Sequence, residues 1–270
     1  MTSSPDDANH ANDADLANDT PDARDAAAAT RQQASSFGAV AELYDASRPS
    51  YPPALVDALL AGDPRRIIDL GAGTGKLTRL LVGRGRDVIA IDPSAEMLTQ
   101  LSARSPEIEA RVGSAEALPL EDASADLVVC AQAWHWVEPV AASAEVARAL
   151  APGGLLALVW NARDIREPWV ARLGEIIGGG AEGSHALGDR PDVEAPFGAP
   201  TMFTTTWVQT MTRTRLHDLV LSRSYVSVRP EPERRQVLDE VDALLDADPL
   251  LSGDEIALPY VTEAYLYRRP

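Results

Sequence analysis

The chain has 270 residues, of which 45% are hydrophobic and 24% are charged, and its formal net charge at pH 7 is −17. This length suffices for one α/β domain with additions. The negative charge argues against nucleic acids and anionic membrane surfaces as partners, because both bind to basic protein faces.

The N-terminal part of the chain differs in composition from the rest. Residues 1–34 are rich in Ala, Asp and Asn and carry 5 of the 17 net negative charges, so we expect a disordered acidic tail. Residues 35–62 then contain aromatic side chains with an arginine, among them Tyr44 and Arg48. We expect helices here, which either pack their aromatic side chains on a sheet or form a lid over a ligand.

A glycine-rich loop follows an apolar run in residues 67–75, Ile-Ile-Asp-Leu-Gly-Ala-Gly-Thr-Gly. The apolar run is typical of a buried parallel strand. Glycines just beyond the carboxyl end of such a strand accept positive φ and let a ligand lie against bare backbone. A helix from about Lys76 would direct its N–H groups into the same crevice. The pattern therefore predicts a nucleotide site.

The spacing of the glycines separates three kinds of nucleotide loop. A phosphate-binding P-loop is excluded at two positions, since Leu70 replaces its first Gly and Leu77 its Ser or Thr. The dinucleotide fingerprint requires Gly at position 76, where this chain has Lys76, so that reading is weakened but stays open. The third code, Asp-x-Gly-x-Gly-x-Gly, matches completely at Asp69, Gly71, Gly73 and Gly75.

A second apolar run, residues 87–92, ends in Asp92, which stands seventeen residues beyond Gly75. An acid at this distance, at the tip of the next strand, is placed to accept hydrogen bonds from ribose hydroxyls. Alternatively, Asp92 caps the helix that we expect to begin near residues 93–97.

Two further predicted strands, residues 109–113 and 125–131, also end in polar residues. The first leads to Ser114 and Ala115, and the second leads to Gln132-Ala133-Trp134-His135-Trp136. Ligands collect at the carboxyl ends of strands in doubly wound sheets. His135 is a candidate general base for an acceptor that must lose a proton. The alternative is that both tryptophans pack in the core and His135 caps a helix.

The remaining chain predicts helices and strands around a Gly- and Pro-rich insertion at residues 161–200. The predicted helices are 141–150, 169–177, 214–222 and 231–246, and the predicted strands are 155–160, 204–210 and 256–267, with a turn at 152–154. Arg223, with Arg213 and Arg215, is a candidate for binding an anionic substrate, although scattered arginines are usually surface residues.

The motif around Asp69 resembles motif I of the class I S-adenosyl-L-methionine (SAM)-dependent methyltransferases, and Asp92 and the Pro-Gly-Gly turn match the same family. Residues 37–52 resemble the N-terminal lid of the small-molecule group that includes trans-aconitate methyltransferases. The resemblance implies an α/β fold, a Rossmann-like seven-stranded sheet of order 3-2-1-4-5-7-6 with strand 7 antiparallel and helices on both faces. We divide the chain into the tail (1–34), lid helices (35–62), the SAM-binding core (63–160), a substrate-shaping insertion (161–200) and the C-terminal part of the sheet with helices (201–270).

The resemblance also implies roles for individual residues. Where the family usually has Asp for the adenine amino group, this chain has Ser114. The implied cofactor-binding residues are Asp69, Gly71, Gly73, Gly75, Asp92, Ser114, Ala115, Gln132 and Arg48. The implied substrate-binding residues are Tyr44, Trp134, Trp136 and Arg223.

The resulting hypothesis is a SAM-dependent methyltransferase that acts by SN2 transfer on a small molecule, with O-methylation of a carboxylate or hydroxyl favoured. An NAD(P)-dependent oxidoreductase and a non-catalytic SAM-binding protein stay open as alternatives. Cys130 is the single cysteine and the four histidines are scattered, so we expect no disulfide and no metal site. No apolar run is long enough to span a membrane and no signal-peptide pattern is present, so we expect a cytoplasmic monomer or homodimer.

Overall fold

The computed structural model describes residues 49–178, 187–249, 251 and 253–270. The chain divides into two compact units, residues 1–36 and 37–270, and all described residues belong to the second unit. The predicted tail, and Tyr44 and Arg48 of the predicted lid, lie outside the described residues. Among the helices described, none is both long and apolar enough to cross a membrane.

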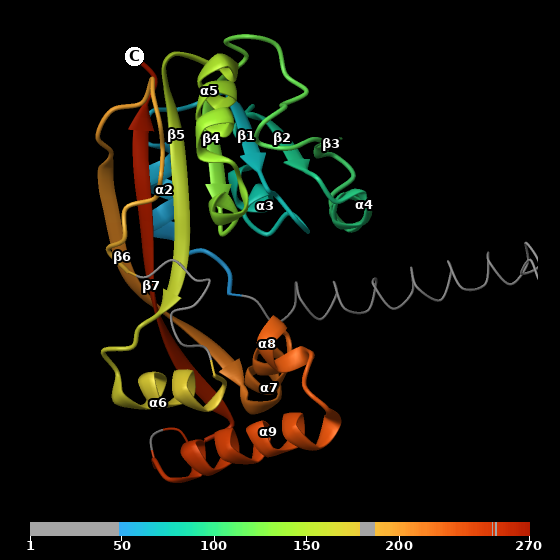
Figure 1. Cartoon of the computed structure of the whole chain (residues 1–270), viewed down its shortest axis with the longest axis vertical. Helices are drawn as coiled ribbons and strands as arrows, with labels where there is room; N and C mark the ends of the chain where they lie inside the picture. The colour runs from blue at the N-terminus through green and yellow to red at the C-terminus, as the bar shows by residue number, and fades with distance from the viewer. Residues whose placement is uncertain (1–48, 179–186, 250, 252) are drawn as a thin grey trace, which may run out of the picture. The chain divides into compact units, whose positions relative to one another are not determined.

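Seven strands form one sheet of order β3-β2-β1-β4-β5-β7-β6 (Figure 1). The strands β1 to β5 pair in parallel, and β7 runs antiparallel to both of its neighbours. This arrangement confirms the predicted fold class and strand order. The strands are β1 (Arg66–Leu70), β2 (Asp87–Asp92), β3 (Glu109–Val112), β4 (Ala125–Ala131), β5 (Leu150–Arg163), β6 (Thr201–Thr212) and β7 (Glu255–Arg268).

Helices cover both faces of the sheet, because alternate residues of each buried strand point to opposite sides. Ile67 of β1 packs with Leu55 and Leu81 on one face, whereas its neighbour Ile68 packs with Val146 on the other. The helices are α2 (Pro53–Leu60), α3 (Thr78–Leu81), α4 (Ala95–Arg104), the 3-10 helix η1 (Trp134–Trp136), α5 (Pro139–Ala149), α6 (Pro168–Ile176), α7 (Arg213–Leu221), α8 (Ser224–Ser227) and α9 (Glu231–Asp246).

The strands β5, β6 and β7 extend beyond the carboxyl ends of the others and carry a second cluster of helices (Figure 1). These three strands have 14, 12 and 14 residues, against 5 in β1 and 7 in β4. The apolar faces of α6, α7 and α9 pack on the extension through Leu173, Leu216 and Val241, which contact the cluster that includes Ile256 and Tyr260.

Two local predictions differ from the structure. The predicted turn at 152–154 lies inside β5, where the register with β4 shifts between Ala125 and Leu127. Gly153 has a φ of 78°, and a glycine in this conformation lets a strand bulge without ending. The helix predicted from Lys76 is only the four-residue α3, since Val82 is extended and Gly83 has positive φ. So short a helix contributes little dipole to the loop before it.

Candidate active site at the carboxyl ends of the strands

The glycine loop lies between the carboxyl ends of β1 and β2. The backbone N–H groups of Gly71 and Ala72 donate to the carbonyl of Ile91, at 2.8 and 3.1 Å. Gly71 has a φ of 71°, and a Cβ there would lie 2.6 Å from the Cβ of Ala133, so the segment after β4 approaches the loop too closely for a side chain. At Gly73, whose φ is 55°, an added Cβ would meet no atom within 4 Å. The loop therefore leaves open space at Gly73.

Asp92 connects this loop to the next helix. One carboxylate oxygen accepts the N–H of Gly73 at 2.8 Å, and the other accepts the N–H of Ser94 at 2.8 Å. The side chain that caps α4 is that of Ser94, which accepts the N–H of Met97, so Asp92 is not the N-cap. Each oxygen of Asp92 keeps a further lone pair for a hydroxyl donor, and Asp92 is 8% exposed.

Asp69 anchors the other side of the loop. Its carboxylate is buried and accepts a hydrogen bond of 2.6 Å from the Thr78 hydroxyl of α3. Burial raises the pKa of Asp69 to about 6; the negative charge of Asp92 also raises it, against the lowering effect of the Thr78 hydrogen bonds. The contact joins the end of β1 to α3, so Asp69 holds the loop at both of its ends.

Gln132 follows β4 directly and has a strained backbone, with a φ of 60°. Left-handed backbone at a residue other than Gly is uncommon and concentrates at functional sites. Its N–H donates to the carbonyl of Val159, and its side-chain amide donates to the carbonyl of Asn161 at 3.1 Å. Both contacts fix the chain where it leaves β4.

The two tryptophans that follow Gln132 have opposite environments. Trp134 is 3% exposed, packs in the core, and donates its indole N–H to the carbonyl of Asp192 at 2.8 Å. Trp136 is 82% exposed, and the ring of the exposed His135 lies 4.9 Å from its own ring, tilted by 46°. The structure thus gives Trp134 a packing role and presents His135 and Trp136 at the surface.

The segment that contains Ser114 and Ala115 is fixed on the first turn of α5. Ser114 forms an isolated bridge with Ala117, and Ala115 is buried. Glu116 accepts the N–H of Glu138 at 2.9 Å, and this backbone hydrogen bond lowers the pKa of the Glu116 carboxyl. Glu116 therefore connects this loop to the start of α5.

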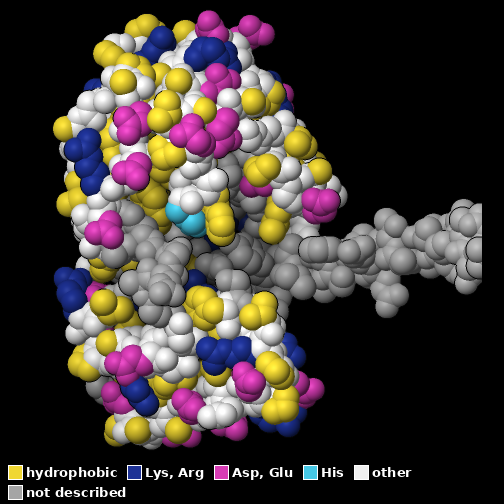
Figure 2. Space-filling model, viewed as in Figure 1, with side chains coloured by type: hydrophobic (Ala, Val, Ile, Leu, Met, Phe, Trp, Pro, Cys, Tyr) yellow, Lys and Arg dark blue, Asp and Glu magenta, His cyan; other side chains and the backbone are white. Residues whose placement is uncertain are grey.

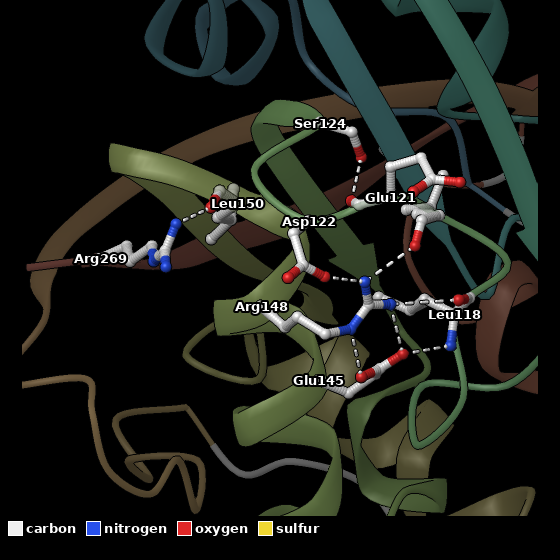
Figure 3. Close-up of polar contacts among 9 residues, drawn as sticks. Leu118, Glu121, Asp122, Ser124, Glu145, Arg148, Leu150 and Arg269 are labelled. Carbon is white, nitrogen blue, oxygen red and sulfur yellow. Dashed lines mark hydrogen bonds and ion pairs between the residues drawn. The ribbon is translucent and has the colours of Figure 1, made fainter.

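A network around Arg148 of α5 holds residues 118–122, which follow this segment (Figure 3). The guanidinium contacts Glu145 and Asp122, each at 2.7 Å, and donates to the carbonyls of Leu118 and Leu120. Glu145 in turn accepts the N–H of Leu118 at 2.9 Å. These bonds raise the pKa of Arg148 and lower that of Glu145, so both stay charged and the loop before β4 is tied to α5.

The structure adds Asn161, which the sequence analysis did not single out. Thr262 donates its hydroxyl to the Asn161 side-chain oxygen at 2.5 Å and accepts the indole N–H of Trp207 at 2.8 Å. The Asn161 side-chain amide then donates to the carbonyl of Ser50 at 2.9 Å. Asn161 thereby connects the end of β5 to the residues that precede α2. The signal in the sequence that could have identified Asn161 is its position as a polar residue directly after the apolar run 155–160.

The candidate arginines lie in the helical cluster beyond β5. Arg213 forms ion pairs with Asp242 at 3.2 Å and Asp246 at 2.7 Å, which gives it a structural role. Arg223 lies between α7 and α8, where its N–H donates to the carbonyl of Val220.

Other features of the described residues point away from alternative sites. A cavity of about 650 Å³ lies at the amino ends of the strands, bounded by residues such as Gly62, Asp126 and Gly154, so it is separate from the glycine loop. In residues 49–178, 187–249, 251 and 253–270 no group of His, Cys, Asp and Glu is arranged to hold a metal. Cys130 is buried, and burial raises the pKa of its thiol. Lys and Arg lie interspersed with Asp and Glu on the face in Figure 2.

Comparisons with known proteins bear on the whole described fold. Residues 68–158 match the family model of a methyltransferase domain. An uncharacterized methyltransferase of Mycobacterium bovis is 48% identical over 233 residues, which cover 86% of this chain and 95% of that protein. An uncharacterized methyltransferase-like protein of Schizosaccharomyces pombe is 36% identical over 232 residues, covering 82% of this chain and 91% of the relative.

Solved structures agree on the fold. A structure described as a type II methyltransferase from Anaeromyxobacter dehalogenans superposes with a TM-score of 0.56 at 24% identity, covering 82% of this chain and 97% of that one. A methyltransferase structure from Anabaena variabilis gives a TM-score of 0.52 at 20% identity, covering 82% and 99%. The similar sequences identify the family, which a shared fold alone does not do. They are named methyltransferases, which argues against the NAD(P)-dependent oxidoreductase. The chain belongs to the class I SAM-dependent methyltransferases.

Proposed function

We propose that this methyltransferase transfers the methyl group of SAM to an oxygen atom, a carboxylate or a hydroxyl, of a small-molecule acceptor. The observation that carries the SAM-binding part of the proposal is the site around Gly73. Open space there lies next to the carboxylate of Asp92, which is buried and bonded only through one N–H on each oxygen among the contacts recorded. Such a site fits a neutral ribose beside bare backbone.

The residues present fit SAM better than a phosphate-bearing nucleotide. Asp69 and Asp92 place two acids beside the loop, and the following helix has four residues, so neither charge nor dipole favours a pyrophosphate. In the proposal, Asp92 accepts from the ribose hydroxyls, and Ser114 and Ala115 border the adenine. Gln132 borders the methionine portion, and Arg48, outside the described residues, would pair with its carboxylate.

SAM, when bound, supplies a methyl group on a positively charged sulfonium. The chain's own contribution is alignment of the acceptor and exclusion of water, which can lower a barrier without any acid or base. The exposed pair His135 and Trp136 would border the acceptor, with the Trp136 ring attractive to a cation. Trp134 is left out of the proposed acceptor site because its ring is buried. Tyr44 and Arg223 stay candidates for substrate contact.

The test of the cofactor site is calorimetric titration of SAM into Asp92→Asn. We expect a loss of affinity of about tenfold or more, since hydrogen bonds to charged groups are strong. Asp126→Asn is the matched control, because Asp126 lies at the opposite ends of the strands and holds backbone N–H groups of Arg65 and Arg66 in the same way. Unchanged SAM affinity in Asp92→Asn would remove Asp92 from the site.

The acceptor is tested by transfer of labelled methyl to a metabolite extract of the native host. A methyl ester releases labelled methanol in alkali, whereas a methyl ether retains the label. His135→Gln then separates the two acceptors, because a hydroxyl needs a base and a carboxylate does not. Label in an amine, a carbon atom or a macromolecule would contradict the proposal. SAM binding with no labelled product would favour a non-catalytic SAM-binding protein.

A further inference from the structure

The two edges of the sheet are built differently. One edge, β3, has four residues, Glu109–Val112, and its Glu109 and Arg111 form an ion pair of 2.7 Å. A short edge strand with charged side chains resists pairing with a strand of another molecule. The β3 edge is therefore protected.

The other edge, β6, has none of these protections. It spans twelve residues, Thr201–Thr212, and pairs with β7 over all twelve without a shift of register. No strand among the described residues pairs with its outer side, which lies at the margin of the sheet opposite β3 (Figure 1). The twelve residues include six threonines but no Lys, Arg, Asp, Glu, Pro or Gly, although 24% of the whole chain is charged.

Four exposed side chains in the middle of β6 form a symmetric pattern. Met202 and Val208 are 56% and 55% exposed, and they lie on the same face of the strand because their positions differ by an even number. Thr204 and Thr206 lie between them on that face and are exposed too. These four residues are symmetric about Thr205.

We propose that β6 pairs antiparallel with β6 of a second copy of this chain, with Thr205 opposite Thr205 of the partner subunit. In this register Met202 lies opposite Val208 of the partner subunit, and Thr204 lies opposite Thr206 of the partner subunit. Directly opposed residues of antiparallel strands share a face and contact one another. Met202 and Val208 thus each meet an apolar side chain, Thr204, Thr205 and Thr206 each meet a threonine, and no charge is buried.

A second copy fits this edge better than an unlike strand, because the symmetric positions 202, 204, 206 and 208 satisfy both partners at once. Antiparallel pairing of identical strands gives a two-fold axis, so the assembly closes as a dimer. The protected β3 edge prevents further growth of the sheet. Three strands, β4, β5 and β7, separate β6 from β1, so the dimer leaves the glycine loop of each copy outside the interface.

The test is the oligomeric state of the full chain, measured by sedimentation velocity over a range of concentrations. We expect a dimer for the wild type and an increase in its dissociation constant of about a hundredfold for Met202→Lys/Val208→Lys, since the register places like charges opposite one another. The control, Ile165→Lys/Val228→Lys, changes two residues that are 63% and 81% exposed outside β6, and should dimerise as the wild type does. Thermal melting checks that both variants fold.

A wild-type chain that stays monomeric up to its solubility limit would overturn the proposal. So would a Met202→Lys/Val208→Lys variant that is folded and dimerises as tightly as the wild type, because the interface would then lie elsewhere. Neither outcome bears on the methyl transfer proposed above, since SAM binding is measured separately.

Cross-linking tests the register itself. In Met202→Cys/Val208→Cys, each new cysteine opposes a cysteine of the partner subunit, so oxidation with diamide should give a disulfide-linked dimer on a non-reducing gel. Met202→Cys alone opposes Val208 of the partner subunit and should stay monomeric on the gel, and the buried Cys130 serves as the background in both. Equal cross-linking of the two variants, or none in a double variant that sediments as a dimer, would rule out this register.

Discussion

Acids of the same type have opposite surroundings at the two ends of the sheet. At the carboxyl ends, Asp69 and Asp92 are buried and are bonded to a hydroxyl and to backbone N–H groups, with no ion pair to a described cation. At the amino ends, Asp126 accepts the N–H groups of Arg65 and Arg66 and also pairs with the Arg66 guanidinium at 2.8 Å. The negative charges of Asp69 and Asp92 are thus not compensated by a described cation, whereas that of Asp126 is compensated by Arg66.

The pKa shifts express the same difference. Burial raises the pKa of Asp69 to about 6. Burial alone would also raise the pKa of Asp126, but the hydrogen bonds from Arg66 and Arg65 hold it below its usual range. The ionised Asp69 therefore lowers the stability of the fold, whereas the ionised Asp126 raises it. Uncompensated acids are tolerated where a ligand site gains from them, and the predictions below test this division of roles.

The largest expected effect is that of Gly71→Ala at the carboxyl end. An alanine there must keep a φ of 71° and place its Cβ 2.6 Å from that of Ala133. The left-handed conformation and the overpacking together should lower the free energy of unfolding by about 3 to 4 kcal/mol. Urea denaturation measures the loss. A variant as stable as the wild type would show that the segment after β4 moves away freely.

The second prediction concerns Asp69→Asn and the dependence of stability on pH. Because the folded-state pKa is raised from 3.8 to about 6, the contribution of Asp69 to stability should fall as the pH rises from about 4 to about 6, and then stay constant. The free energy of unfolding of Asp69→Asn minus that of the wild type should therefore be greater at pH 8 than at pH 4, by up to about 3 kcal/mol. Denaturation curves at both pH values measure the difference.

The control for Asp69→Asn is Asp126→Asn, for which the sign is reversed. The lowered pKa of Asp126 means that its stabilising effect is present at neutral pH and is lost as the pH falls through the folded-state pKa. Asp126→Asn should thus be less stable than the wild type at pH 8. If the stability of both variants relative to the wild type changed in the same direction between pH 4 and pH 8, then Asp69 and Asp126 would not have opposite effects on the fold.

Several strands and the loops at their carboxyl ends were predictable from the sequence, because short apolar runs end in acids and glycines at these positions. The predicted strands 87–92 and 125–131 match β2 and β4 at both ends, and the predicted helix 231–246 matches α9. The prediction of a turn at 152–154 is wrong because a glycine at positive φ, in this chain, shapes a bulge within β5. Local sequence does not distinguish the two outcomes.

The parts of the site that sequence analysis could not predict depend on distant partners. Trp134 and Trp136 stand two positions apart in one loop, but only Trp134 packs in the core, and its indole N–H donates to the carbonyl of Asp192, 58 residues away. Asn161 is fixed by Thr262, 101 residues away in β7. Periodicity contains no information on such contacts, so the roles of these residues followed only from the structure.

The smallest expected stability change gives the sharpest comparison of the two ends, through Gly73→Ala and Gly153→Ala. Both glycines have positive φ, 55° and 78°, and a Cβ at either would meet nothing within 4 Å. Each substitution should therefore cost about 1 to 2 kcal/mol of stability, from the left-handed backbone alone. They should differ in SAM affinity, because a methyl group at Gly73 enters the proposed ligand space, whereas Gly153 lies at the amino end of β5. Calorimetry on both variants measures the contrast. An equal loss of affinity in Gly153→Ala would mean that lowered stability of the fold, rather than occupied space at Gly73, causes the loss.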